Sequence, residues 1–348
     1  MLTMYKWDSP ALKQIWQKLY ADNPYLFPYS SWEYNEQIYK YMKVKPSSMF
    51  QKNFFCVYEE EKKPLVLFPL YLKKNKLCLF GENISGAGHL DLLYDAAITT
   101  KQFENAFSEL KSMFPGKTLE LCMINERSKI YRFLQEMSVA GTDAFFPVKA
   151  EEERVCVKIP FPDSYEEYER GLSRHSRNNL RNAYSKARRD KQDISIQVIR
   201  GPFTDKALLS EAMKIYTKRE SERKNRRMDF IPYIKHRYFS PIVWAMETLA
   251  SHYTFCVFLN NKLAAFMTGF ATNYNEIVFP YVAIDSNYAV YSPGKLMISE
   301  GVKYLQNCDS IRGLDLSRGD EHYKFVMGGV RHYNYNNSLL CKKSNTVV

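Results

Sequence analysis

The sequence predicts a mixed α/β (α+β) protein, in which mixed β-sheets are flanked by helices and two halves resemble each other. Three observations predict this fold class. Strand patterns alternate with helix patterns along the 348 residues. The same coarse order of helices, hairpin, further strands, helix and strand occurs in both halves. The composition, with 45% hydrophobic and 25% charged residues, is typical of a globular chain long enough for two domains.

The first half is predicted to begin with helices and to continue as a strand meander. Ser9 followed by Pro10 is a typical helix start. Short apolar or alternating runs bounded by charged turns are typical of strands. The expected elements are helices at 10–20, 31–42 and 101–114 and strands at 54–60, 64–74, 76–81 and 118–124.

Residues 150–162 are interpreted as a junction, so the expected domains are residues 1–155 and 156–348. After it, Asp163 begins a helix that Gly171 ends, and the Asn260-Asn261 pair suits a hairpin turn. The expected elements are helices at 163–171, 173–190 and 293–307, with strands on both sides of the hairpin turn, at 275–285 and at 311–317.

The positive charge of the chain is concentrated in its second half. Lys and Arg total 49 against 38 Asp and Glu, a formal net charge of +11. Residues 170–200 carry nine basic and two acidic side chains, and residues 214–237 carry nine and three. The rest of the chain is therefore slightly acidic. This concentration favours a phosphorylated cofactor or an acidic acceptor over diffuse polyanion binding.

The sequence predicts a cytoplasmic protein with reduced thiols. The N-terminal residues lack the apolar stretch of a signal peptide, and no run approaches the ~18 apolar residues of a membrane span. No transmembrane segment is expected, and peripheral membrane contact is left open. The seven cysteines contain no Cys-x-x-Cys, which argues against a disulfide framework or a thiolate zinc site.

The sharpest local motif is Tyr291-Ser292-Pro293-Gly294-Lys295 at a predicted helix start. Ser292 can cap the helix, Pro293 fits its first position, and Gly294 leaves the backbone N–H groups open to a ligand. Such a start can bind phosphate. A helix start that only needs a good cap is the alternative.

The segment 315–324 is dense in ionisable groups. Strand alternation predicts that Asp315 faces a cleft or solvent. A charged surface turn, bent at Gly319-Asp320, is the alternative. Metal ligation by Asp315, Asp320 and His322 lacks a recognised spacing, so no metal is expected.

The helix at 173–190 is predicted to have a basic edge beside an apolar stripe. At about 100° per residue, the basic stripe is about 60° wide. It contains Arg174, Arg177, Arg181 and Arg188. The apolar stripe contains Leu180, Ala183, Tyr184 and Ala187. Guanidinium groups on such an edge suit phosphate or carboxylate recognition, and a solvated charged face is the equal alternative.

Four segments together resemble the GNAT-type acetyltransferases of the CelD (cellulose biosynthesis) group. They are LSRHSRNNLRNAYSKARR, FLNNKLAAFMTGF, VFPYVAIDSNYAVYSPGKLMISEGVKYLQ and IRGLDLSRGDEHYKFVMGG. The resemblance covers residues 163–330 and extends more loosely through SSWEYNEQ and PLVLFPLYL. It implies tandem GNAT-like mixed sheets, with acyl-CoA in the second half and a degenerate first half without cofactor.

The resemblance implies a site for acetyl-CoA or another acyl-CoA. The cofactor-binding residues it implies are Val282, Ala283, Ile284, Ser292, Pro293, Gly294, Lys295 and Leu296. The first three would line the pantetheine arm, and the amides at the helix start would hold the pyrophosphate. Ser-Pro-Gly-Lys departs from the usual Gln/Arg-x-x-Gly-x-Gly/Ala loop of the superfamily.

The reaction that the resemblance implies is direct acyl transfer from a thioester to an amine or hydroxyl. Asp315 is the expected base and Tyr323 the expected acid. Orientation of the site is expected from Arg318, Asp320 and Lys324, and acceptor binding from Arg174, Arg177, Asn178, Arg181 and Arg219. Family analogy suggests a sugar, a lipid-linked saccharide or an amine as acceptor, in envelope polysaccharide assembly.

Two alternatives stay open. Fem-type peptidoglycan aminoacyl transferases also use duplicated GNAT halves, and their aminoacyl-tRNA donor would suit the basic windows. A non-catalytic module for anionic glycan or nucleic acid is the other, although no helix-turn-helix, RRM or zinc-finger pattern supports it. Walker A, GxGxxG and Gly-x-Ser-x-Gly motifs are absent from the sequence.

Overall fold

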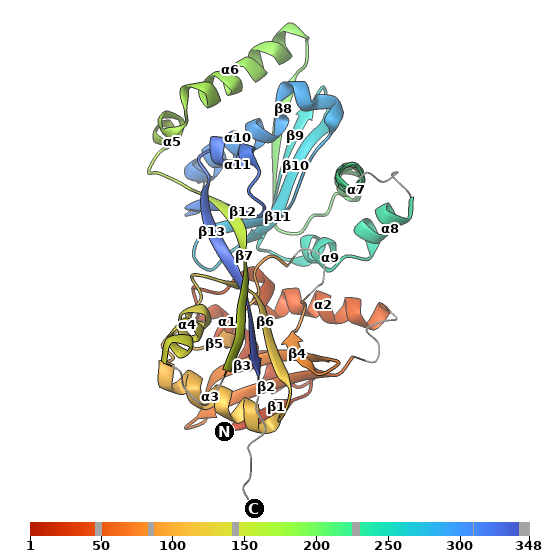
Figure 1. Ribbon diagram of the computed structural model, residues 1–348. Coiled ribbons are helices and arrows are strands. Elements are labelled where there is room, and N and C mark those ends of the chain that lie inside the picture. The colour runs from red at the N-terminus through yellow and green to blue at the C-terminus, as the bar shows by residue number, and fades with distance from the viewer. Residues whose placement is uncertain (46–50, 83–86, 141–145, 225–229, 309, 341–348) are drawn as a thin grey trace, which may run out of the picture. The chain divides into compact units, whose positions relative to one another are not determined.

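The computed structural model describes residues 1–45, 51–82, 87–140, 146–224, 230–308 and 310–340. The chain forms two compact units (Figure 1). The first unit is Met1–Arg154 with Tyr333–Val348, and the second unit is Val155–His332. The C-terminal strand thus groups with the first unit and not with the second half of the chain. No helix in the described residues is long and apolar enough to cross a membrane.

The first unit is a mixed sheet with helices on both faces. Its strands are β1 Leu2–Tyr5, β2 Asn53–Glu60, β3 Lys63–Lys73, β4 Lys76–Leu79, β5 Leu93–Tyr94, β6 Thr118–Asn125 and β13 Val330–Leu340. Its helices are α1 Pro10–Ala21, α2 Trp32–Val44, α3 Thr100–Met113 and α4 Lys129–Ala140, with the 3-10 turn η1 Pro28–Ser30. The strand order is β1-β2-β3-β4-β6-β13, β5 pairs with β3, and β4 and β6 are parallel.

Two aromatic contacts show how the first unit fills its two layers. Phe55 and Phe68 occupy adjacent register positions on β2 and β3 and therefore point to opposite faces. On one face Phe55 packs against Trp16 of α1, with ring centroids 6.0 Å apart. On the other, Phe68 meets Phe107 of α3 at 5.3 Å. The sheet is therefore buried on both sides.

The second unit has the same architecture. Its strands are β7 Phe146–Pro160, which begins in the first unit, β8 Ile194–Arg200, β9 His252–Leu259, β10 Lys262–Ala271, β11 Glu276–Ile284 and β12 Gly313–Arg318. Its helices are α5 Tyr165–Gly171, α6 Arg174–Arg189, α7 Lys206–Arg223, α8 Phe230–Tyr238, α9 Pro241–Thr248, α10 Pro293–Cys308 and α11 His322–Val326, with the 3-10 segment η3 Ser286–Tyr291. The strand order is β7-β12-β11-β10-β9-β8, and in the described part of this series only β11 and β12 pair in parallel.

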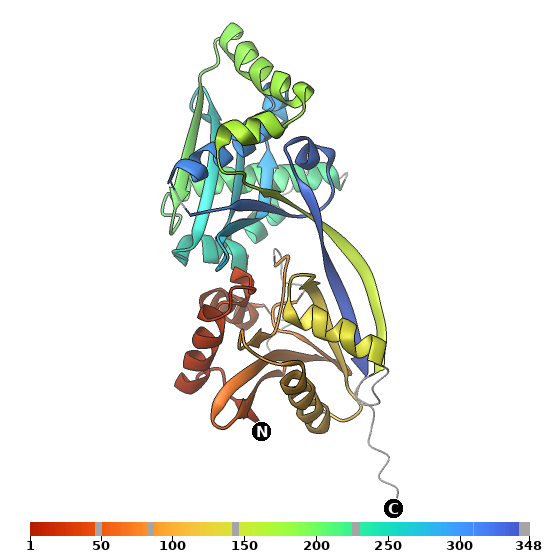
Figure 2. The ribbon, with the colours of Figure 1, turned by 90° about the vertical axis from the view of Figure 1, so that its left-hand side faces the viewer.

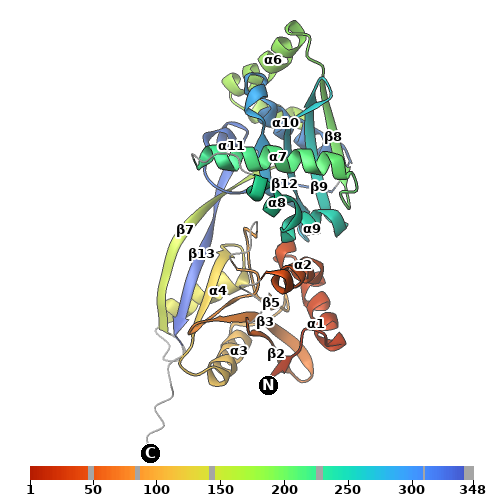
Figure 3. The ribbon, with the colours of Figure 1, turned by 90° about the vertical axis from the view of Figure 1, so that its right-hand side faces the viewer.

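Helices cover both faces of the second sheet. Helix α7 crosses one face over β10 and β11 (Figure 3), where Tyr216 stacks on Tyr281 with centroids 4.2 Å apart. Helix α10 covers the other face, and α5 and α6 lie on its outer side (Figure 2). Phe255, Phe279 and Leu296 belong to the core between α10 and the sheet.

The two units share one topology. In each, an antiparallel series of four strands is followed by a helix and then by one parallel neighbour: β1-β2-β3-β4, α3 and β6 in the first unit, and β8-β9-β10-β11, α10 and β12 in the second. This order confirms the predicted fold class and makes the resemblance of the two halves visible. The likeness of the two units lies in the order of their elements, since the sequence shows no residue-level repeat.

Most elements expected from the sequence are present at nearly the predicted bounds. The hairpin between β9 and β10 turns at Asn260 and Asn261, with φ values of 46° and 62°, as a tight primed turn requires. Residues 150–162, interpreted as a junction, instead lie largely within strand β7, and Phe161 and Pro162 follow it. Strands β1, β8 and β13 and helices α4, α7, α8, α9 and α11 were not predicted.

Candidate functional site

Strands β11 and β12 of the second unit separate soon after they meet. Their parallel pairing covers three residues and ends at Val278 and Asp315. Beyond this point β11 continues along β10 to Ile284, whereas β12 pairs with β7 as far as Arg318. Within the described chain, the edge of β11 at 279–284 therefore has no ladder to β12. Backbone groups on such an edge can pair with an extended ligand.

Gly269 allows β10 and β11 to approach closely where β12 departs. The register of these two strands shifts between Thr268 and Phe270. A Cβ atom on Gly269 would lie 1.9 Å from the carbonyl oxygen of Val278, a distance that no side chain tolerates. The bulge and the separation of β11 from β12 thus occur at the same residue of β11.

The open edge of β11 leads through η3 to the start of α10. Ser292 has a left-handed backbone, with φ 50° and ψ 44°, and not the extended conformation of an ordinary N-cap. Its carbonyl accepts from the amides of Lys295 at 3.0 Å and Leu296 at 3.2 Å. Of the three amides expected to hold pyrophosphate, only that of Gly294 has no backbone acceptor among the described residues. A Cβ on Gly294 would come within 2.5 Å of Cδ1 of Ile284.

The equivalent position of the first unit is closed. Helix α3 begins with a capping box, in which the Thr99 side chain accepts from the Gln102 amide and the Gln102 side chain accepts from the Thr99 amide. Strand β4 ends at Leu79, one residue beyond its last pair with β6. The first unit therefore lacks the long strand edge that the second unit has.

Arg219 of α7 connects the open edge with α11. Its guanidinium donates a hydrogen bond to the carbonyl of Val282. Burial, together with the nearby Glu321 carboxylate, raises the pKa of Tyr323 to about 12, and Arg219 opposes this shift. Although partial burial acts to raise it, the cations of Lys324 and Arg219 hold the pKa of Glu321 below its ordinary value. At neutral pH this corner thus holds a phenol and a carboxylate.

Lys324 organises the end of β12. Its side chain is 2% exposed, and its ammonium donates to the carbonyls of Leu316, Arg318 and Gly319 at 2.9–3.0 Å and more weakly to that of Ser317 at 3.4 Å. The same nitrogen lies 3.0 Å from a carboxylate oxygen of Glu321. Lys324 was expected to orient the site, and these contacts give it a way to do so.

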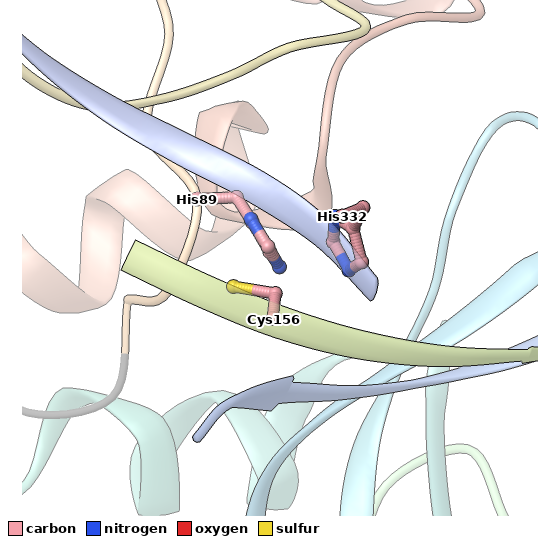
Figure 4. Close-up of side chains that lie close together, drawn as sticks. All are labelled: His89, Cys156 and His332. Carbon is pink, nitrogen blue, oxygen red and sulfur yellow. The ribbon is translucent and has the colours of Figure 1, made fainter. Parts of the chain in front are cut away.

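Asp315 does not face solvent as strand alternation predicts. Its side chain is fully buried because β12 is covered on both faces. Oδ1 accepts from the Ser317 amide at 2.8 Å, and Oδ2 lies 3.1 Å from Nε2 of His332 on β13. Figure 4 shows His332 with Cys156 of β7, another buried residue of the second unit whose sulfur is within 4.8 Å of the imidazole nitrogen. His89, also drawn there, belongs to the first unit.

Helix α6 has the basic edge and buried stripe that were predicted, with two differences. Tyr184, expected in the apolar stripe, is 39% exposed and donates to Glu300 at 2.7 Å. Arg177 donates to the carbonyls of Glu169, Arg170 and Leu172, so it closes the end of α5 instead of facing solvent. The predicted acceptor-binding residues Arg174, Asn178 and Arg181 remain exposed on α6.

The predicted site residues therefore fall into two groups. One group surrounds the β11 edge and the α10 start: Val282, Ala283, Ile284, Ser292, Pro293, Gly294, Lys295, Leu296, Arg219, Tyr323 and Lys324. The other group lies away from this edge: Arg174, Asn178, Arg181, Arg318 and Asp320 are exposed, Arg177 is half-buried at the end of α5, and Asp315 is fully buried. Of the three residues considered as metal ligands, Asp320 and His322 are exposed whereas Asp315 is buried, so they do not form a shared ligand set.

Sequence reasoning missed Glu321 and His332. Glu321 could have been selected, because it lies inside the ionisable segment between two expected site residues. No local sequence pattern identifies His332. It lies 17 residues beyond Asp315 in the chain, and only the tertiary structure brings the two side chains together.

Comparison with known proteins supports the fold. Residues 174–325 match the family model described as acetyltransferase (GNAT) domain. A structure of FemX has a TM-score of 0.60 at 11% identity, with 97% of this chain and 96% of that chain covered. A conserved protein of unknown function from Bacteroides thetaiotaomicron gives 0.57 at 8%, with 98% and 100% covered. A tandem GNAT protein from the clavulanic acid biosynthesis pathway gives 0.50 at 8%, with 99% of each chain covered.

These identities show likeness of fold alone, and the fold of the chain is tandem GNAT-like. No curated protein matches the chain as a relative. The matched GNAT range contains the separating strands, the start of α10 and Tyr323, all within the second unit.

Proposed function

We propose that the second unit, with its GNAT domain, is a CelD-type acyltransferase that moves an acyl group from acetyl-CoA or another acyl-CoA to an amine or hydroxyl. A cytoplasmic sugar or envelope polysaccharide precursor would suit the basic surface of this unit as an acidic acceptor. The first unit would then serve as a scaffold, because its α3 start is capped and its β4 edge is short.

One observation carries this proposal: the strand edge at 279–284 is free of β12 and leads directly to a helix start. The amides of a pantetheine arm can pair with such an edge. The diphosphate at the other end of the same ligand would meet the N-terminus of α10, where the helix dipole and the Gly294 amide favour negative charge. One extended, phosphorylated ligand therefore fits both features.

The residues near this edge suit acyl transfer. The acceptor nitrogen or oxygen attacks the thioester carbonyl carbon, the carbon–sulfur bond breaks, the acceptor loses a proton and the thiolate gains one. Tyr323 can supply the thiolate's proton, since a pKa of about 12 keeps it protonated at neutral pH. Glu321, held ionised by Lys324 and Arg219, can accept the other proton.

Asp315, expected from the sequence as the base, is better suited to positioning. Its carboxylate is fully buried, with one oxygen bound to the Ser317 amide and the other beside His332. From there it holds the turn at the end of β12, which precedes Tyr323 in the chain. The acceptor would approach from the side of Arg219.

Replacement of Ser292 by Asp tests the proposal. The left-handed backbone of Ser292 suits Asp and Asn equally, so both variants should fold. The carboxylate of Ser292→Asp would repel a diphosphate at the α10 start and should weaken acetyl-CoA binding by about tenfold or more, measured by calorimetry. The neutral isostere Ser292→Asn should bind like the wild type. Equal acetyl-CoA binding by both variants would show that the start of α10 does not bind the diphosphate.

The exposed arginines of α6 favour one second candidate, a Fem-like transferase that takes its acyl group from aminoacyl-tRNA. That enzyme would bind tRNA with an affinity that falls steeply with salt, because each neutralised phosphate releases counterions. Saturable acetyl-CoA binding without tRNA binding at low salt excludes it. Polyanion binding without any acyl transfer would instead indicate a non-catalytic binding module.

A further inference from the structure

Helix α8 of the second unit exposes part of its apolar side chains to solvent. At about 100° per residue, Ile231, Lys235 and Tyr238 form one stripe about 60° wide. Ile231 is 79% exposed, and Tyr238 and the following Phe239 are each 48% exposed. A surface helix of a globular protein normally places polar residues there.

The inner side of α8 makes polar contacts beside the half-buried Tyr233 and Ile234. Arg237 is 5% exposed, lies 3.1 Å from the Glu247 carboxylate and donates to the Ser210 hydroxyl at 3.2 Å. Nδ1 of His236 is 3.1 Å from the hydroxyl of Thr217 on α7. These contacts set the rotation of α8, since turning it to bury Ile231 would leave Arg237 and Glu247 without each other. The outward apolar stripe is therefore built into the unit.

Exposed hydrophobic side chains are concentrated at this helix. Among the described residues, ten large hydrophobic side chains are exposed, and three of them lie between positions 231 and 239. Single exposed apolar residues need no explanation, but a group of them on one surface marks an interaction site. We call Ile231, Lys235, Tyr238 and Phe239 the α8 surface.

We infer that the α8 surface binds the interface of a membrane containing anionic phospholipids. Isoleucine and aromatic rings favour the boundary between headgroups and acyl chains. Lys235 can extend its charged end to the headgroups while its stem stays among the apolar side chains. Helix α7, which packs against α8, adds attraction to negative lipid through its exposed cations Lys214 and Arg223 and its C-cap residue Lys224.

Other occupants fit the α8 surface less well. A second copy of the chain would bring two strongly basic windows face to face. Protein interfaces are depleted of lysine, and Lys235 lies in the middle of the stripe. The membrane proposal does not depend on which acyl donor the second unit uses.

The experiment compares vesicles of phosphatidylcholine and phosphatidylglycerol with vesicles of phosphatidylcholine alone, by co-sedimentation of the full chain. The wild type should bind the anionic vesicles at least tenfold more tightly. Ile231→Gln, Tyr238→Gln and Phe239→Gln combined should lower this binding at least tenfold. Lys235→Glu, which keeps the apolar residues and exposes no new surface, should lower it as well.

A matched control carries Met4→Gln, Val290→Gln and Val330→Gln, three exposed hydrophobic residues elsewhere on the chain. This control should bind anionic vesicles like the wild type. A second control, Arg174→Gln with Arg181→Gln on α6, should retain most of the binding. Unchanged circular dichroism of each variant confirms that it is folded.

Four results would overturn the inference. They are no preference of the wild type for anionic vesicles, unchanged binding of both α8 variants, equal loss in the Met4/Val290/Val330 control, and a dimer of the wild type that the α8 variants dissociate. The last result would assign the surface to a second copy of the chain. If only the α6 variant lost vesicle binding, that binding would be assigned to α6 instead.

Discussion

The side chain of Lys324 shows how much of this site depends on one buried charge. Its ammonium binds carbonyls from four successive residues at the end of β12 and pairs with Glu321. Because the carbonyl groups point at the ammonium, the peptide N–H groups of the same turn point away from it. The ammonium therefore helps to hold the turn before Tyr323, together with the hydrogen bonds from the Ser317 amide to Asp315 and from the Gly319 amide to Val155.

Replacing Lys324 by Met should destabilise the second unit by about 3 kcal/mol, because several buried carbonyls lose their donor. The measurement is the free energy of urea unfolding of the full chain. As a matched control, Lys262→Met removes an exposed ammonium at the start of β10 and should change stability by less than about 0.5 kcal/mol. Equal stabilities of the two variants would show that other groups satisfy the carbonyls.

At the level of single residues, the sequence indicated which side chains take part in polar contacts better than it indicated whether those side chains are buried or exposed. The alternation of β12 predicted an accessible Asp315, but alternation assumes one open face, and helices cover both faces of this sheet. Likewise Arg177 was expected on a ligand-binding edge, whereas the end of α5 lies within its reach. Such contacts depend on chain segments that no local pattern records.

Among the elements, the pair β10–β11 depends most strictly on one position. Gly269→Ala should prevent normal folding of the second unit or cost more than about 4 kcal/mol, because the new Cβ would overlap the Val278 carbonyl. The shift of the melting temperature measures this effect.

Gly171→Ala is the control for this substitution. Gly171 ends α5, and no heavy atom lies within 4 Å of its added Cβ. The variant should therefore stay within about 1 kcal/mol of the wild type. A Gly269→Ala protein that melts with the control would show that β10 and β11 can move apart at the bulge.

The elements that the sequence predicted carry strong local signals. Ser164 caps α5, Pro293 begins α10, and paired asparagines turn the β9–β10 hairpin. Helix α7, which was missed, has buried residues spread over more than one side, so no clean 3.6-residue apolar stripe identifies it. Helix α8 was missed because its apolar residues are divided between its exposed and its half-buried side.

At the scale of the whole molecule, each unit contains a buried group whose pKa burial shifts strongly, Asp91 in the first and His252 in the second, and the two respond to pH in opposite directions. Burial raises the pKa of Asp91 in the first unit from 3.8 to about 7. Burial lowers the pKa of His252 in the second unit from 6.5 to about 4, and the hydrogen bond to the Gly201 carbonyl opposes this shift. In the folded protein the Asp91 carboxyl therefore keeps its proton below about pH 7, and the His252 imidazole stays neutral above about pH 4.

The first unit should lose stability as pH rises from 3.8 towards 7, because unfolded Asp91 ionises there and folded Asp91 does not. The second unit should lose stability as pH falls from 6.5 towards 4, because only unfolded His252 gains a proton. The effect amounts to at most about 4 kcal/mol for Asp91 and about 3 kcal/mol for His252. Calorimetry of the full chain across this range should show two transitions moving in opposite directions.

Asp91→Asn and His252→Gln assign the two transitions. Each variant should flatten the pH dependence of its own unit and leave that of the other unchanged. Transitions that move together in the wild type, or that respond to the variant in the other unit, would contradict the assignment.

The strand β13 has a consequence for the order in which the chain becomes structured on the ribosome. It pairs with β6 from Asn334 to Leu340, so the sheet of the first unit receives its sixth strand only after the whole second unit has been synthesised. The second unit is one uninterrupted stretch, Val155–His332, and leaves the exit tunnel whole before that strand does. The unit that is translated later can therefore finish folding first, and the first unit waits for residues 334–340 to complete its sheet.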